Sequence, residues 1–298
     1  MGEEEVWQAV KASDGRSLEV VSQGSADALP LLFHGGTPLA AVLHPPIVDA
    51  AIARGLRFIT YSRPGYATSD PMPGRSVADA VGDVVAILEA LNADRFVTIG
   101  WSGGGPHALA CAAMLPDRCA GVATIAGVAP YPADGIDWLA GMGEENIEEF
   151  GAALDGEAAL SAYLKEEAIG LSQVTATDLD DALGDLVSDI DRASLTGPFA
   201  EWAATSFRKA VSTGIAGWRD DDLAFVKPWG FDLARITRPV ALWQGSDDRM
   251  VPFSHGKWLA AHVPTARSRM LEGEGHLSVG VGAFGRIVED LVQLAKDT

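Results

Sequence analysis

Short apolar runs alternate with amphipathic stretches over most of the chain, and each run predicts a strand. Near the N-terminus, two runs flank the turn dipeptide Asp14-Gly15, so residues 6–11 and 17–21 are expected to form a β-hairpin. Later runs lack polar alternation, which is typical of strands buried on both faces. They lie at residues 29–33, 56–61, 96–101 and 122–126, and the pattern resumes at residues 239–244 and 268–271.

The amphipathic stretches between these runs predict helices. In residues 76–91 the apolar side chains fall on one face at helical spacing, and Ser76 suits the N-terminus of that helix. Further helices are expected after residue 102, ending near Leu115, and at residues 255–261 and 279–296. Strand and helix alternation at this spacing predicts parallel pairing through right-handed crossovers. The fold class is therefore α/β, with a mostly parallel, doubly wound sheet.

The middle of the chain breaks this alternation. Between residues 130 and 230 the strand signal disappears, and helical patterns cover residues 144–154, 157–164, 178–187 and 199–211. The simplest interpretation is a helical cap, or lid, at residues 130–230. It would be inserted into a core domain made of residues 1–129 and 231–298.

Charge is distributed unevenly between these two parts. The 298 residues include 41 acidic and 22 basic side chains, a formal charge of -19, and the expected cap alone holds 20 acidic and 6 basic ones. A field of that sign repels phosphate backbones and anionic lipid surfaces, so no nucleic-acid or membrane partner is expected. The cap carboxylates are interpreted as a solvated outer face.

The remaining composition points to a reduced, cofactor-free protein. Cys111 and Cys119 are too few for a disulfide framework or a four-cysteine metal site, and both lie in apolar stretches that suit buried thiols. Residues 1–5 lack the basic and apolar regions of a signal peptide, and no apolar stretch is long enough to span a membrane. Glycines 103–105 lack the lysine and spacing of a phosphate loop. We expect a cytoplasmic monomer or homodimer with no metal or cofactor.

One segment carries candidate chemistry. Gly100-Trp101-Ser102-Gly103-Gly104 ends a predicted strand and opens a predicted helix, and it has the G-x-S-x-G form of a nucleophile elbow. Glycines make room for a sharp turn that raises the serine hydroxyl above the sheet edge. The turn also points the N–H of Gly103 toward that space, where a helix N-terminus favours an oxyanion. Because such turns also occur for packing, the assignment depends on a base, a carboxylate and further donors elsewhere.

The later strands provide these partners in chain order. Asp247 and Asp248 follow the strand at 239–244, and His276 follows the next one, so all three belong to the same edge of the sheet as Ser102. Gly36, directly after the first parallel strand, is the expected second oxyanion donor, with Thr37 as its alternative. The other histidines receive structural interpretations: His107 packs on the elbow helix, His255 and His262 lie on a surface helix, His34 is a structural hydrogen-bonding group, and His44 lies in a loop within possible reach of the site.

Together these segments resemble the α/β-hydrolase-fold serine hydrolases. The matching blocks are His34-Gly35-Gly36, Tyr61-Ser62-Arg63-Pro64-Gly65-Tyr66, the serine elbow, Asp248-Arg249-x-Val251-Pro252 and Gly275-His276. The resemblance covers essentially the whole chain and implies the α/β-hydrolase fold with a cap after the sixth strand. It also favours Asp248 over Asp247, because the family places its aspartate three residues after the glycine of that block.

One position departs from the family pattern, and one block is similar to a particular branch of the family. Ser62 stands where many relatives have aspartate before the arginine, and we expect this to affect loop packing rather than catalysis. The His-Gly-Gly block is similar to that of proline iminopeptidases. Their elbow is usually Gly-Gly-Ser-Trp-Gly, however, and the order here differs.

The resemblance implies a catalytic triad of Ser102, Asp248 and His276 and an acyl-enzyme on the serine. A serine at the nucleophile position argues against haloalkane dehalogenase and epoxide hydrolase activity, because enzymes of this fold with those activities use aspartate as the nucleophile. We expect a carboxylesterase-like hydrolase of class EC 3.1.1 that cleaves an ester, lactone or thioester of a small molecule. The alternatives are an aminopeptidase or amidase, a C–C bond hydrolase, and a non-catalytic binder. Cap residues expected to contact an apolar or aromatic acyl group are Trp138, Met142, Trp202 and Phe207; the cap's acidity would instead suit a cationic substrate.

Overall fold

The structure is a computed structural model that describes residues 4–296. Residues 1–3, on which part of the expectation about a signal peptide rests, lie outside the described residues. Within the described range, no helix combines the length and the hydropathy needed to cross a membrane.

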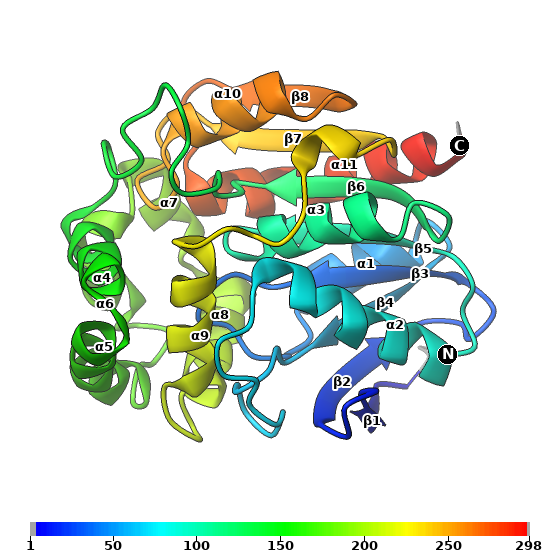
Figure 1. Cartoon of the computed structure of the whole chain (residues 1–298), viewed down its shortest axis with the longest axis horizontal. Helices are drawn as coiled ribbons and strands as arrows, with labels where there is room; N and C mark the ends of the chain where they lie inside the picture. The colour runs from blue at the N-terminus through cyan, green and yellow to red at the C-terminus, as the bar shows by residue number, and fades with distance from the viewer. Residues whose placement is uncertain (1–3, 297–298) are drawn as a thin grey trace.

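Eight strands form a single sheet (Figure 1). They are β1 (Val6–Lys11), β2 (Ser17–Gln23), β3 (Leu29–His34), β4 (Leu56–Tyr61), β5 (Phe96–Trp101), β6 (Cys119–Ile125), β7 (Val240–Gly245) and β8 (Ala266–Leu271). Their order in the sheet is β1-β2-β4-β3-β5-β6-β7-β8. The hairpin β1–β2 is antiparallel and pairs with β4 in antiparallel fashion, and the other neighbours are parallel. The predicted α/β class with a mostly parallel sheet is confirmed.

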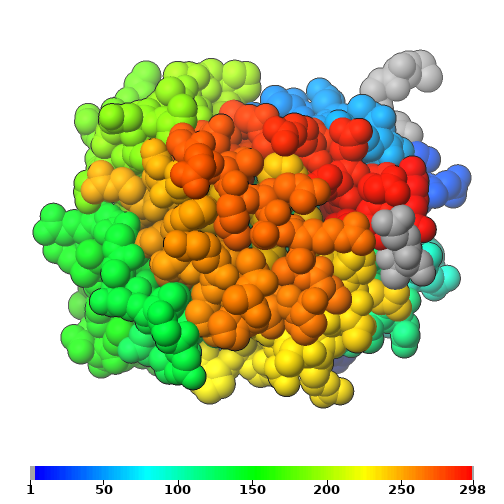
Figure 2. Space-filling view, turned by 90° about the horizontal axis from the view of Figure 1, so that it is seen from above, coloured from blue at the N-terminus to red at the C-terminus, as the bar shows by residue number. Residues whose placement is uncertain are grey.

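Helices cover both faces of the sheet. On one face lie α2 (Ala80–Ala90), α3 (Gly104–Met114) and α10 (Phe253–His262). The other face carries α1 (Pro45–Ile52) and α11 (His276–Lys296), whose apolar sides pack on β3 to β7. Figure 2 looks onto the β8 edge, with α10 in orange and α11 in red. The strands β5, β6 and β7 are buried along their whole length, which explains why their sequences lack polar alternation.

The helical region between β6 and β7 gathers beyond one end of the sheet, at the left of Figure 1. Its helices are α4 (Glu144–Asp155), α5 (Glu157–Leu171), α6 (Leu179–Leu183), α7 (Asp189–Ser194), α8 (Gly197–Ala210) and α9 (Ala216–Phe225), with 3-10 turns at Gly184–Leu186 and Leu233–Arg235. Its apolar side chains join the clusters on both faces of the sheet. The expected insertion of a helical region is confirmed.

Some elements differ from the expectation. The helices α1, α7 and α9 were not predicted: α1 starts with two prolines, which fit a first helical turn but resemble a loop, and α7 has only six residues. The last helix begins at His276, three residues earlier than expected. The interpretation of the inserted carboxylates as a solvated face is wrong for four of them, because Asp191, Asp220, Asp221 and Asp222 are buried.

The strand order brings two loops together. The chain moves from β3 to β4 on one side and then crosses back to β5 on the other, so β3 marks a switch in direction. In parallel sheets the crevice beyond the carboxyl ends at such a point is where ligands bind. His34 pairs in register with Gly100, so the segments that follow them, with Gly36 and Ser102, emerge side by side.

Candidate active site

Ser102 occupies a strained turn between β5 and α3. Its φ is 55°, a left-handed conformation that is rare for residues other than glycine, and its N–H donates to the carbonyl of Ile125 at 2.8 Å. A Cβ at Gly100 would lie 2.2 Å from the carbonyl oxygen of Gly104, and one at Gly104 would lie 2.0 Å from that of His34. The turn therefore needs both glycines, as the elbow motif predicts.

His276 and Asp248 form a buried pair near this turn. The Nδ1 of His276 lies 2.9 Å from Oδ2 and 3.1 Å from Oδ1 of Asp248. The same carboxylate accepts hydrogen bonds from Gln244 Nε2 and from the N–H groups of Met250 and Val251. These donors fix the orientation of the carboxylate and compensate its burial. A proton on Nδ1 leaves Nε2 free to act as a base.

The rival side chains lie elsewhere. Asp247 is exposed and accepts a hydrogen bond from Ser246, so it makes no contact with the imidazole. His107 and His34 are buried beneath the elbow, and His44 packs against the rings of Phe199 and Trp202. His255 does lie on the surface helix α10, but its side chain faces inward and is fully buried. Its Nδ1 accepts from Ala129 N–H and its Nε2 lies 2.8 Å from the Trp138 carbonyl.

The charged groups around His276 make its imidazole easier to protonate. Burial by itself lowers the pKa of the imidazole, but the Asp248 carboxylate opposes it through charge and a hydrogen bond, and Asp191 adds a smaller effect of the same sign. The net result is a pKa raised above the ordinary 6.5. A base of this kind accepts a proton readily near neutral pH.

The loop after β3 presents backbone N–H groups to the elbow. Arg63 donates to the carbonyls of Gly35 (2.6 Å) and Gly36 (2.9 Å), which turns both carbonyls toward the guanidinium. Because N–H and C=O point in opposite directions across a trans peptide, the N–H groups of Gly36 and Thr37 point away from Arg63. A Cβ on Gly36 would lie 3.2 Å from Cβ of Ser102, so this backbone passes directly beside the serine.

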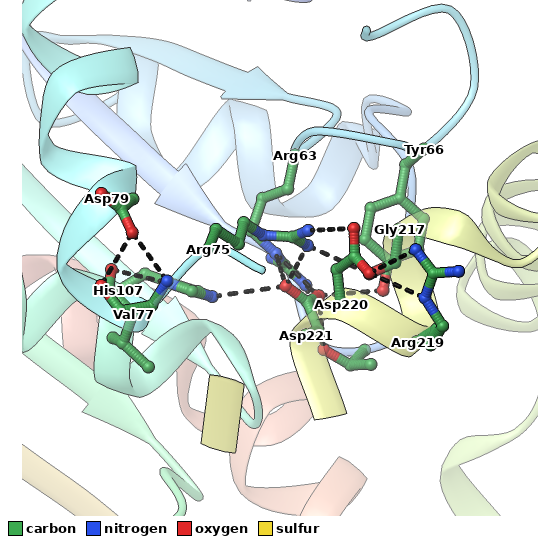
Figure 3. A network of polar contacts seen from close by, with 12 residues as sticks. Arg63, Tyr66, Arg75, Val77, Asp79, His107, Gly217, Arg219, Asp220 and Asp221 are labelled. Carbon is green, nitrogen blue, oxygen red and sulfur yellow. Dashed lines mark hydrogen bonds and ion pairs between the residues drawn. The ribbon is translucent and has the colours of Figure 1, made fainter. Parts of the chain in front are cut away.

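A buried ion cluster holds that loop (Figure 3). Asp221, on α9 of the inserted region, accepts hydrogen bonds from Arg63, Arg75, the Tyr66 hydroxyl and the Thr37 hydroxyl. Its exposed fraction is 0%, and burial alone would raise its pKa, yet the two guanidinium groups keep that pKa well below the ordinary value. The Asp221 carboxylate therefore stays ionised, and the cluster ties the loop after β3 to the inserted helices.

One cavity of about 300 Å³ contains the candidate groups. Ser102, His276 and Gly36 all line it. Of the four cap residues expected to contact substrate, Trp202 and Phe207 line the cavity, next to Phe199 and Trp101. The wall is mainly aromatic and aliphatic, which suits an apolar group attached to the reacting carbonyl.

Trp138 and Met142 do not line this cavity. Trp138 is buried, donates from Nε1 to the Ala129 carbonyl at 2.8 Å, and packs edge-on against Phe150 and His255. Met142 is buried in the same hydrophobic cluster. Their expected role in substrate binding is therefore corrected to packing between the inserted region and the core. The segment before α4 packs against α10 and away from the cavity, and nothing in the sequence alone indicated which way these side chains face.

Part of the cavity wall is acidic. Glu145, Glu149 and Glu167 line it, and the described lining residues include no lysine or arginine. Glu149 accepts a hydrogen bond from Trp218 Nε1 at 2.8 Å, and its carboxyl interacts with the buried carboxyl of Asp222. Burial raises the pKa of Glu149 to about 7, so this carboxyl is partly protonated near neutral pH.

Three residues of the site were missed by sequence reasoning. Arg63 was seen only as part of a family block, without a role. Asp221 lies in a run of three aspartates and Asp191 in a short polar helix, and neither stretch carries a motif. Their only sequence signal was an excess of carboxylates in the inserted region. Among residues 4–296 the structure has no group of three or more histidine, cysteine, aspartate or glutamate side chains arranged to hold a metal ion.

The sheet order, the elbow and the inserted helices define an α/β hydrolase. The sequence model of the α/β-hydrolase fold family matches residues 30–283, and the chain belongs to this family. A non-heme chloroperoxidase of Streptomyces lividans is 30% identical over 273 residues, which cover 90% of this chain and 92% of the relative.

Two further comparisons broaden this picture. A 2-hydroxy-6-oxononadienedioate/2-hydroxy-6-oxononatrienedioate hydrolase of Cupriavidus pinatubonensis is 26% identical over 257 residues, which cover 82% of this chain and 79% of the relative. The solved structure of the esterase EaEST from Exiguobacterium antarcticum has the same fold, with a TM-score of 0.70 at 18% identity, covering 98% of this chain and all of that one. The family relationship thus establishes a hydrolase of this fold and leaves the bond it cleaves to be argued from the site.

Proposed function

We propose that this protein is a serine hydrolase that cleaves small carboxylic esters through an acyl-enzyme on Ser102. The observation that carries the proposal is the convergence of three groups on one cavity. These groups are the elbow serine, the imidazole held by Asp248, and the backbone of Gly36. This is the set of groups that an acyl-transfer reaction needs.

The reaction proceeds in two halves. His276 takes the proton of the Ser102 hydroxyl as the oxygen attacks the ester carbonyl, and Asp248 stabilises the imidazolium that forms. The N–H groups of Gly36 and Gly103 donate to the oxyanion of the tetrahedral intermediate. His276 then gives its proton to the leaving alcohol. In the second half a water molecule, deprotonated by His276, attacks the acyl-enzyme; the bond to Ser102 breaks, His276 returns the proton to the serine oxygen, and the acid is released.

The cavity favours an apolar acyl or alcohol group. Phe199, Trp202 and Phe207 supply aromatic surface close to the candidate nucleophile, in a space of about 300 Å³. Such a wall stabilises an alkyl or aryl group by removing it from water. We therefore expect uncharged esters of moderate size to be the best substrates.

The acidic part of the wall argues against the C–C bond alternative. The relative from Cupriavidus pinatubonensis carries a substrate name that describes a dicarboxylate, which is a dianion at neutral pH. Here the lining residues include three glutamates and no cation, so a second substrate carboxylate would meet repulsion rather than a partner. An ester without a free carboxylate meets no such penalty.

The test combines labelling with a substrate screen. A fluorophosphonate probe should label wild-type protein at Ser102 and leave a folded Ser102→Ala variant unlabelled. The screen compares p-nitrophenyl esters of increasing chain length with lactones, aminoacyl arylamides and a dienedioate. Ester hydrolysis that greatly exceeds the others supports the proposal. Absence of labelling in folded wild-type protein would instead indicate a binding protein, and preference for arylamides an aminopeptidase.

A further inference from the structure

The N-terminus of α11 has an unusual partner. Helix α11 begins at His276, and the first N–H groups of a helix have no acceptor within it. All three of its leading N–H groups donate to one carboxylate: His276 to Oδ2 of Asp191 at 2.9 Å, Leu277 to Oδ1 at 2.7 Å and Ser278 to Oδ1 at 2.9 Å. Asp191 is therefore the capping group of the helix that starts with the candidate base.

This cap comes from the inserted region. Asp191 lies on α7, 85 residues before His276 in the chain, and its exposed fraction is 0%. Local capping residues normally stand directly before a helix and are serine, threonine, aspartate or asparagine. Here that position is Gly275, and a Cβ there would lie 2.3 Å from Oδ2 of Asp191. The glycine leaves the space that the distant carboxylate fills.

The carboxylate also changes the charge around the imidazole. A helix N-terminus carries a partial positive charge that disfavours an imidazolium, and an aspartate at this point offsets it. The other charged groups around His276 are Asp248 after β7, Glu274 just before α11, and the three glutamates of the cavity wall, Glu145, Glu149 and Glu167. The nearby Arg249 is paired with Asp185.

We propose that Asp191 is a positioning residue for the reaction, by which the inserted region holds the backbone of His276 in place and supplies a negative charge beside its imidazole. The proposal rests on the role of His276 as general base. It makes the inserted region part of the catalytic apparatus rather than only a wall of the pocket. If Asp191 only stabilised the fold, it would make the same hydrogen bonds, but removing its charge would leave the pKa of His276 unchanged.

The decisive variant is Asp191→Asn, which keeps the shape but removes the charge and one acceptor oxygen. We expect kcat for p-nitrophenyl acetate to fall roughly 10- to 100-fold, since small displacements of a catalytic group cost about that much. KM should change little, because Asp191 does not line the cavity. Loss of a negative charge destabilises the imidazolium, so the acid limb of kcat/KM should move to lower pH by about half a unit to one unit.

Two further variants separate charge from position. Asp191→Glu keeps the charge but displaces it by one methylene, so it should lower kcat while leaving the acid limb in place. Asp189→Asn removes an exposed charge from the same helix and should leave both quantities unchanged. If Asp191→Asn does not fold, Asp191→Glu decides: wild-type kcat in that variant overturns the positioning role.

An NMR titration of the His276 imidazole supplies a readout that needs no substrate. It should show a lower pKa in folded Asp191→Asn than in wild-type protein. An unchanged pKa in the folded variant overturns the proposal, because Asp191 then supplies no effective charge to the imidazole. If wild-type protein neither hydrolyses esters nor reacts with fluorophosphonate, the proposed function fails, and the titration still reports whether Asp191 controls His276.

Discussion

The sheet core and the inserted helical region contribute to the site in different ways. In the core, the candidate reacting groups stand directly after β3, β5, β7 and β8, and each is marked by a short motif. In the inserted region, the groups that matter are two buried aspartates on short helices, Asp191 and Asp221. One contacts the backbone of His276, and the other pairs with Arg63 beneath the β3 loop.

The two regions therefore have different roles. In the proposed reaction the core supplies the groups that transfer protons and form the covalent bond to the substrate, and this chemistry restricts which residues can serve. The inserted region supplies pocket walls and fixed negative charges that hold the core loops in position. Variants in the two regions should therefore differ in kind: loss of reaction in the core, and loss of positioning, stability or selectivity in the inserted helices.

The largest effect is expected for Ser102→Ala. Without the nucleophile, turnover of an activated ester should fall by about 10⁴- to 10⁶-fold, as loss of a triad member does in such enzymes. The circular-dichroism melting curve should stay close to that of wild type, since the hydroxyl contributes little to packing. Substantial turnover in the folded variant would contradict the assignment of the nucleophile to the core.

The next largest effect is expected for Asp248→Asn. The amide no longer stabilises the imidazolium, and it can hold the imidazole in the wrong tautomer, so kcat should fall by about 10⁴-fold. Wild-type kcat/KM should decline as the pH drops through a pKa above 6.5, because protonated His276 cannot accept the serine proton. The control is Asp247→Asn at the exposed neighbour, and equal activity of the two variants would refute the ranking.

Asp221→Asn tests the charge that the inserted region places under the β3 loop. Removing one partner leaves Arg63 and Arg75 buried with less compensation, which costs about 3–5 kcal/mol of unfolding free energy. The measurement is urea unfolding together with kcat. Arg63→Lys keeps the charge but loses the fork that holds two carbonyls, so it should lower kcat with a smaller loss of stability. Unchanged kcat in Arg63→Lys would mean that the loop after β3 keeps its conformation without the hydrogen bonds from Arg63.

Two tryptophans of the inserted region provide a matched pair. Trp202 lines the cavity, so Trp202→Ala should change the ratio of kcat/KM for long and short p-nitrophenyl esters by roughly 10-fold. Trp138 packs away from the cavity, so Trp138→Ala should lower stability by about 3–5 kcal/mol and leave that ratio unchanged. A uniform loss on every ester in Trp202→Ala would show that this ring is only part of the core.

The smallest effect concerns stability against pH. The pKa of Glu149 is raised by burial from 4.5 to about 7, so the folded protein binds a proton that the unfolded chain releases. The contribution of this carboxyl to stability should therefore decline as pH rises from 4.5 through 7. It opposes the contribution of the buried histidines His34, His44, His107 and His255, whose lowered pKa values make stability rise over part of the same range. The difference in Tm between wild type and variant, at about 2–4 °C per kcal/mol, isolates the carboxyl contribution. Asp222→Asn removes the coupled carboxyl and should flatten this decline, whereas Glu148→Gln on the exposed side of α4 should not. An equally steep decline in Asp222→Asn would contradict the coupling.

Much of the fold could be predicted because its signals are local. Buried strands show as apolar runs, turns as Asp-Gly or glycine pairs, and the elbow as a pattern whose glycines are required by contacts within a few residues. The candidate triad followed for the same reason: each member stands just after a strand, and parallel strands share one edge. The side chains of the inserted region could not be placed this way, as Trp138 and Met142 demonstrate.

The amino-acid sequence by itself determined the α/β class and the identity of the serine, aspartate and histidine that we propose as the triad. It also determined which predicted strand each of these three residues follows. Only the tertiary structure decided where α11 begins, because the acceptor for its first N–H groups is Asp191, far away in the chain. It also decided that Asp221 is a buried, charged anchor, because its partners Arg63 and Arg75 come from the core. Long-range hydrogen bonds and ion pairs leave no periodic trace in a sequence, since the energy of a buried charge depends on partners that only folding brings into contact.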